Sequence, residues 1–82
     1  MAKRYVYKVH QTNGTVRNEV TEGKATLDQL QRWVGGYIEH VRLYAGCYVY
    51  VNEEGLLKGL PKNPDYAYLV GDVVELPKGC RN

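Results

Sequence analysis

The sequence lacks phenylalanine and is poor in other large apolar rings: its 82 residues include one tryptophan and eight tyrosines. Tyrosine hydroxyls need water or a hydrogen-bond partner even when the ring is buried. A chain of this length also buries only about 60% of the surface that its unfolded form exposes. We therefore expect one domain over residues 1–82 with a thin core, and at least one group of tyrosines on a contact surface.

Long apolar runs are also missing. No segment approaches the roughly 18 apolar residues of a membrane helix, and the basic start of the chain is not followed by the apolar stretch of a signal peptide. These absences predict a cytoplasmic protein with no membrane contact. Eleven basic residues nearly balance nine acidic ones, and no basic run exceeds Lys3-Arg4. The charge therefore disfavours nucleic acid as the partner.

The residues of metal and catalytic chemistry are few and widely separated. Cys47 and Cys80 lie far apart, and neither His10 nor His40 has a close ligand neighbour, so we expect reduced thiols and no metal site. No phosphate-binding loop or serine–histidine–aspartate order is present. The prediction is a protein that is not an enzyme and needs no cofactor; the weaker alternative is a nucleotide hydrolase that uses His40 and Glu39.

A hairpin is predicted near the start of the chain. Two runs rich in β-branched and aromatic residues flank Asn13-Gly14, a dipeptide typical of tight hairpin turns. The hairpin would span residues 3–22. Alternation along its first strand places Tyr5, Tyr7 and Val9 on one face.

A short amphipathic helix is predicted to follow. Thr26 with Gln29 three positions later matches a capping box, and apolar residues then recur at helical spacing. Gly35-Gly36 favours termination there, because glycine readily adopts the left-handed cap conformation. The alternative is a helix that continues to Val41.

The remaining segments indicate an α+β fold: a small, mostly antiparallel sheet of five or six strands with one amphipathic helix packed on one face. The core of the domain would span residues 26–76. Its expected segments are strands over 37–44 and 47–51, a turn over 52–55, a strand over 56–60 that pairs back, a helical turn over 65–69, a final strand over 72–76, and a frayed tail over 77–82.

Residues 27–76 carry the ordered motifs VGGYIE, NEEG, LP, N and GDV. In these motifs the chain resembles a family of small phage and bacterial proteins known only as a domain of unknown function. By analogy it is similar to small phage proteins that sequester nucleotide immune signals. This analogy implies a protein that antagonises host anti-phage defence by holding an ADP-ribose derivative or cyclic nucleotide, uncleaved. Because a thin-cored chain of 82 residues has little room for such a pocket, we expect a homo-oligomer with the pocket between protomers.

The candidate ligand-binding residues would supply three kinds of contact: backbone N–H groups and cations for phosphates, rings for stacking, and acceptors for hydroxyls. They are Arg32, Trp33, Gly35, Gly36, Tyr37, Glu39, Arg42, Asn52, Lys58 and Asn63. Each has a structural alternative. The glycines can serve close packing, Trp33 can belong to the core, and the asparagines can stabilise turns.

A second functional hypothesis is a module that docks a host protein. The exposed edge of the predicted hairpin over residues 3–22 would supply the surface. The same edge could serve self-assembly.

Overall fold

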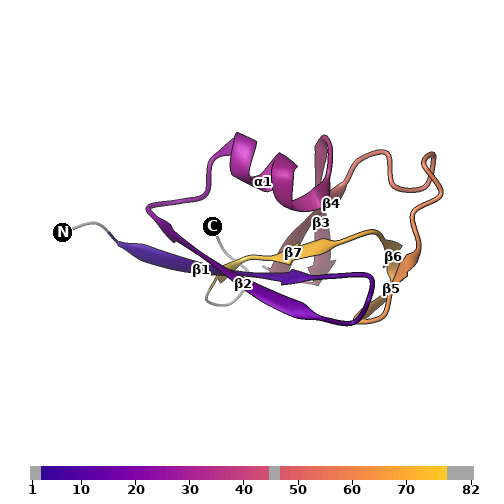
Figure 1. Cartoon of the computed structure of the whole chain (residues 1–82), viewed down its shortest axis with the longest axis horizontal. Coiled ribbons are helices and arrows are strands. Elements are labelled where there is room, and N and C mark those ends of the chain that lie inside the picture. Colours follow the sequence, from indigo (N-terminus) through magenta and orange to yellow (C-terminus); the bar gives the residue numbers. More distant parts are fainter. Residues whose placement is uncertain (1–2, 45–46, 78–82) are drawn as a thin grey trace.

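The computed structural model describes residues 3–44 and 47–77, which form an α+β fold of seven strands and one helix (Figure 1). Five strands build an antiparallel sheet in the order β2-β1-β7-β4-β3, and two more form a small second sheet. The elements are β1 (Arg4–His10), β2 (Val16–Glu22), α1 (Leu27–Val34), β3 (Ile38–Tyr44), β4 (Cys47–Asn52), β5 (Lys62–Asn63), β6 (Tyr66–Val70) and β7 (Val73–Glu75).

The N-terminal hairpin is confirmed. Strands β1 and β2 pair along their full length, from Arg4 opposite Glu22 to His10 opposite Val16. At the turn, the side-chain oxygen of Asn13 accepts the N–H of Thr15 at 2.9 Å, as turn-forming asparagines do. The turn residues and the alternation along both strands agree with this register.

Helix α1 begins and ends where its caps require. The Thr26 side chain accepts the N–H of Gln29, and the Gln29 side chain accepts the N–H of Thr26 in return. Gly35 ends the helix in the left-handed conformation, with φ of 81°. The helix therefore does not continue to Val41, and the chain departs as β3.

Two predicted elements are wrong. Residues 56–60 do not form a strand, because the chain turns back on itself there. The N–H of Lys58 donates to the carbonyl of Glu54, and the N–H of Leu60 donates to the carbonyl of Gly55. Residues 65–69 do not form a helical turn, because most of them belong to β6, which pairs with β5. The predicted frayed tail lies, from residue 78 onward, outside the described residues.

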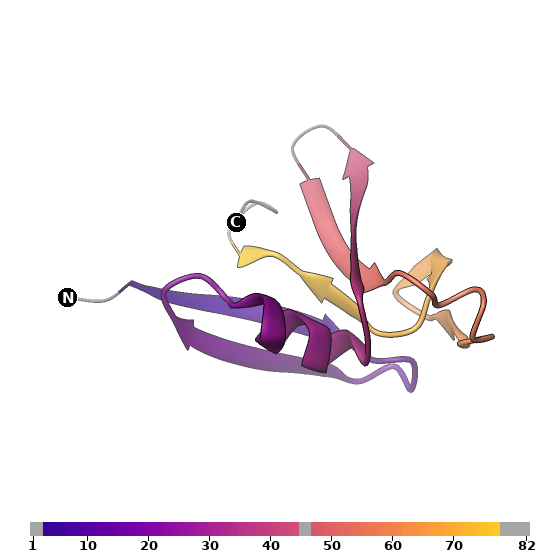
Figure 2. The same cartoon turned by 90° about the horizontal axis from the view of Figure 1, so that it is seen from above.

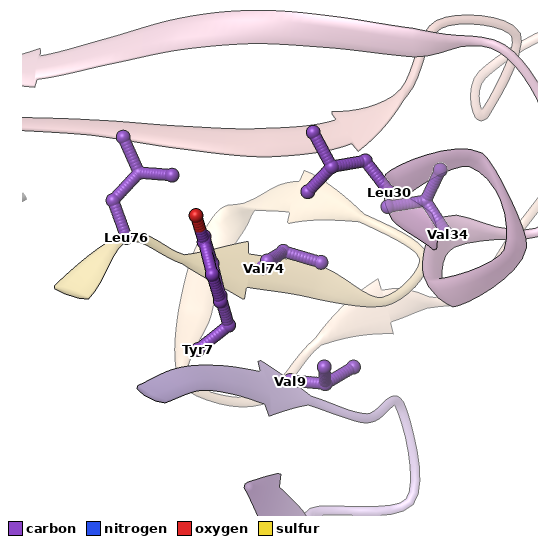
Figure 3. Close-up of a cluster of buried hydrophobic side chains, with 6 residues drawn as sticks. All are labelled: Tyr7, Val9, Leu30, Val34, Val74 and Leu76. Carbon is purple, nitrogen blue, oxygen red and sulfur yellow. The ribbon is translucent and has the colours of Figure 1, made fainter. Parts of the chain in front are cut away.

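The sheet carries a hydrophobic cluster on each face. Helix α1 covers one face, where its residues Leu30 and Val34 form a cluster with Tyr7, Val9, Val74 and Leu76 (Figure 3). The opposite face holds Val49, Val51 and Val73, with Tyr66 and Leu69 of β6 packed against them. Each fully buried valine or leucine contributes about 1.5–3 kcal/mol. Because each cluster is small, the domain depends on both.

Tyr7 lies at the centre of the helix-side cluster, where its hydroxyl accepts the N–H of Ala25 at 3.0 Å. Burial raises the pKa of this phenol above 10.0, and the neighbouring Tyr50 and Tyr5 add to the rise, against the hydrogen bond from Ala25. A raised acid pKa means that the folded state holds the proton more tightly than the unfolded state.

The expected consequence is alkaline instability. The contribution of neutral Tyr7 is fully present below the unfolded-state pKa of about 10 and is lost as pH rises through the folded-state pKa. Denaturant titrations from pH 8 upward should therefore show stability falling above pH 10. Tyr7→Phe should flatten this fall, whereas Tyr37→Phe, at an exposed ring, should leave it unchanged. An unchanged slope in Tyr7→Phe would contradict the assignment.

Candidate binding surface

Three of the candidate residues meet just after helix α1. A Cβ placed on Gly36 would lie 2.9 Å from Nδ2 of Asn52 and 3.5 Å from Nζ of Lys58. Asn52 is buried; its Nδ2 donates to the Val34 carbonyl at 3.2 Å and its Oδ1 accepts the N–H of Glu54 at 2.8 Å. The second glycine therefore makes room for an asparagine that joins the end of α1 to the turn after β4.

The backbone N–H groups that were predicted to bind phosphate already have hydrogen-bond acceptors within the protein. The N–H groups of Gly35 and Gly36 both donate to the Gln31 carbonyl, at 2.8 and 3.0 Å. These bonds satisfy the carbonyl end of the helix. Binding a pyrophosphate through the same N–H groups would require the cap to open.

The other candidates are dispersed. Arg32 is exposed on the last turn of α1, and Trp33 packs on the core with its ring centroid 5.4 Å from that of Tyr7. Arg42 is exposed on β3, opposite Tyr48. Neither arginine is among the residues nearest to a Cβ placed on Gly35 or Gly36.

Asn63 lies elsewhere and is fully buried. Its Nδ2 donates to the carbonyls of His10 at 2.7 Å and Gly71 at 2.9 Å, and its Oδ1 accepts the N–H of Asp65 at 2.9 Å. These bonds tie β5 to the end of β1 and the start of the last strand. A ligand has no access to this side chain, so its role is structural.

Glu39 and Asn52 do lie together, in a groove of about 360 Å³ that we call the loop groove. Residues 53–57 and strand β6 form its sides. Its lining consists of Glu39, Val41, Val51, Asn52, Glu53, Gly55, Leu56, Leu57, Tyr68, Leu69 and Val70.

The rim of the loop groove is strongly apolar. Leu56 is 84% exposed, Leu57 88% and Tyr68 73%. Tyr37, also exposed, stands beside the same loop, because its carbonyl accepts the N–H of Glu53. Single exposed apolar residues are common, but a contiguous group around a concavity is typical of a contact surface.

The charges of the loop groove are acidic. Glu39 and Glu53 line it, and the nearby cation, Lys58, lies 3.6 Å from Glu54 and is thus partly neutralised. A phosphate group would meet these carboxylates. An apolar partner with a basic residue fits this chemistry better.

One polar cluster was not predicted from the sequence. The ring of His10 bridges two carboxylates: Nδ1 lies 2.8 Å from Asp65 and Nε2 lies 2.9 Å from Glu75. The Tyr66 hydroxyl donates to the same Glu75 oxygen at 3.3 Å, and its ring meets His10 edge-on. Because these partners are separated from His10 by 55 and 65 positions in the chain, no local sequence pattern predicts their contact. The cluster holds the β5–β6 hairpin to β1 and β7.

Metal binding finds no support in the described part of the chain. Within residues 3–44 and 47–77, no group of three histidine, cysteine, aspartate or glutamate side chains is arranged to hold a metal ion. In the His10 cluster, each ring nitrogen already faces a carboxylate.

Gly36→Ala is expected to destabilise the fold by about 1–2 kcal/mol, because the new Cβ displaces the buried amide of Asn52 from the Val34 carbonyl. Urea unfolding measures this loss. A double-mutant cycle with Asn52→Ala supplies the control: the Gly36→Ala cost should shrink once the amide is absent. An equal cost in both backgrounds would show that the contact is not responsible.

Taken together, the geometry defines a small α+β domain with a five-stranded antiparallel sheet and an apolar loop groove. The family described as Domain of unknown function (DUF3846) matches residues 4–78, and the chain belongs to this family. No curated protein and no solved structure matches the chain. Among the described residues, no helix is both long and apolar enough to cross a membrane.

Proposed function

We propose that this domain is a non-catalytic binding module whose target is another protein, held at the loop groove. The observation that carries the proposal is the exposure of Leu56, Leu57 and Tyr68 around one concavity. The domain has few large apolar side chains, yet three of them face water together. A protein partner would remove them from water.

The energy available at this surface is substantial. Burying one leucine contributes about 1.5–3 kcal/mol, and an aromatic ring anchored in a pocket is a frequent hot spot. Neither leucine belongs to the two hydrophobic clusters of the core, so core packing does not explain why these side chains are kept apolar. The loop is nevertheless held in shape: Gly55 is buried, and a Cβ there would lie 2.8 Å from Val70. A preformed loop loses little entropy on binding.

The charges narrow the partner's chemistry. Glu39 and Glu53 line the groove beside the leucines, so the matching segment should present apolar side chains flanked by lysine or arginine. Such a segment would be attracted before contact and desolvated at its apolar centre. The proposal places the contact at the loop, whereas the sequence alone suggested the hairpin edge.

Site-specific photocrosslinking tests this function. A photoreactive residue at position 57 should give one discrete protein adduct in cells, and the same residue at Asn18, exposed on β2, should not. The adduct should weaken when Glu39→Lys cancels the negative charge that Glu39 and Glu53 give the groove. Equal adducts from both positions, or none from position 57, would count against the proposal.

Sequestration of a nucleotide-derived immune signal is our second proposal. What favours it is another groove, of about 340 Å³, lined by Lys3, Arg4 and Lys8. Three cations at a cavity of this size suit a phosphate-bearing ligand. A calorimetric screen with cyclic nucleotides and ADP-ribose derivatives should then give stoichiometric binding and recovery of intact ligand. Binding unaffected by Arg4→Gln would exclude this site.

A further inference from the structure

Strand β7, the last strand along the chain, is much shorter than β1, which lies beside it in the sheet. Strand β1 has seven residues, but β7 pairs with only three of them, Lys8 to His10. Beyond Glu75 the chain diverges from β1, and in Figure 2 the yellow strand separates from the indigo one towards the C-terminal end. Among the described residues, no strand pairs with Arg4–Tyr7 on this side. We call this opening the β1–β7 fork.

Hydrogen bonds at the two ends of the hairpin fix which backbone groups face the fork. The Lys3 carbonyl accepts the N–H of Gly23, and the Gln11 N–H donates to the Thr15 carbonyl. Along an antiparallel strand, alternate residues direct both backbone groups to the same side. Odd-numbered residues therefore face β2, and the N–H and C=O groups of Arg4 and Val6 face the fork.

The fork coincides with the second groove. Its lining consists of Lys3, Arg4, Tyr5, Val6, Lys8, Glu75, Leu76 and Pro77. Leu76 and Pro77 form the far wall, and proline has no N–H with which to continue the ladder. The backbone of β1 is therefore accessible inside a concavity rather than along a flat edge.

The charge of the fork is positive. Lys3, Arg4 and Lys8 make no ion pair within the described residues. The lining carboxylate of Glu75 is already engaged by His10 at 2.9 Å and by the Tyr66 hydroxyl at 3.3 Å. The groove thus combines uncompensated cations with unpaired backbone groups.

We propose that the β1–β7 fork binds an extended acidic segment of another polypeptide, which adds as a strand beside Arg4 and Val6. Strand addition supplies main-chain hydrogen bonds, and alternate side chains supply specificity. Arg4 and Val6 share one face of β1. The docked segment should therefore carry an acidic residue opposite Arg4 and, two positions away, a β-branched residue opposite Val6.

A docked strand would contact more of the groups in this groove than a small nucleotide would. A nucleotide would use the cations but leave the backbone groups of Arg4 and Val6 without a ladder. This inference is independent of the loop groove, which involves different residues and the opposite charge.

Selection from a displayed library of short random peptides tests the inference. The enriched peptides should carry an acidic residue and a β-branched residue two positions apart, in the order β-branched, any residue, acidic if the peptide runs antiparallel to β1, as β7 does. Their affinity should fall about tenfold or more in a variant that combines Arg4→Gln with Lys8→Gln. Lys24→Gln, which removes an exposed charge outside the groove, and Leu57→Asp should leave affinity unchanged. In the complex, hydrogen exchange of the Arg4 and Val6 amides should slow.

Three results would overturn the inference. Peptides selected without acidic residues, or none at all, would remove the charge argument. Binding without slower exchange at Arg4 and Val6 would show that no strand is added. Arg4-dependent binding of ADP-ribose that displaces the peptides without protecting these amides would instead support nucleotide sequestration.

Discussion

Asn63→Ala should lower the free energy of unfolding by about 3 kcal/mol, because each buried polar group left without its partner costs about 1–3 kcal/mol. The side chain is 0% exposed and makes three hydrogen bonds. Alanine would leave the carbonyls of His10 and Gly71 unsatisfied at the junction of two sheets. A domain of this length has roughly 4–12 kcal/mol of total stability.

Equilibrium urea denaturation followed by circular dichroism measures the loss. Asn18→Ala, at an exposed position of β2, is the matched control and should change stability by less than about 0.5 kcal/mol. If the two alanine variants unfolded at the same denaturant concentration, the buried asparagine would not be the anchor of the β5–β6 hairpin.

Replacing both Leu56 and Leu57 by aspartate should abolish partner binding, with affinity at least about 100-fold weaker, because two apolar contacts are lost and two carboxylates would be buried against the apolar centre of the partner segment. The same variant should keep its unfolding free energy within about 0.5 kcal/mol, since both side chains are almost fully exposed. The expected outcome is thus a stable protein that does not bind.

Val16→Asp with Leu27→Asp is the matched control, because it places the same charges on other exposed apolar residues, which line neither groove. This variant should retain the partner. Loss of binding in both variants would indicate a general charge effect, and loss of folding in the Leu56 and Leu57 variant would indicate that the loop is part of the core.

The elements that could be predicted from sequence are those specified by local chemistry. Asn13-Gly14 sets the hairpin, and Thr26 with Gln29 sets the start of α1. Gly35 ends the helix because few other residues tolerate its backbone conformation. Each signal acts within a few residues, so no tertiary information is needed.

Residues 53–70 could not be predicted in the same way. Their apolar residues suggested a pairing strand, but Leu56 and Leu57 face water in a hydrogen-bonded loop. Asp65 to Leu69 suggested a helical turn, yet β6 pairs with β5 because Asn63 fixes that corner from inside. A tertiary anchor overrides local propensity here.

The candidate site was predicted in part. Gly36, Asn52 and Lys58 do come together, and Glu39 lies with Asn52 in the loop groove. The roles that these residues have in the structure could not be predicted from sequence, because hydrogen-bond partners such as the carbonyls of Gln31 and Val34 depend on the cap geometry. Nucleotide sequestration and homo-oligomerisation stay predictions, as does the absence of enzymatic activity.

Calorimetry of the domain with the protein captured from position 57 tests the central claim most directly. Titrations at several temperatures should give one partner per domain and a clearly negative heat-capacity change, because apolar surface at Leu56, Leu57 and Tyr68 leaves water on binding. A heat-capacity change near zero, with affinity that collapses as salt rises, would contradict this account and assign binding to charge instead.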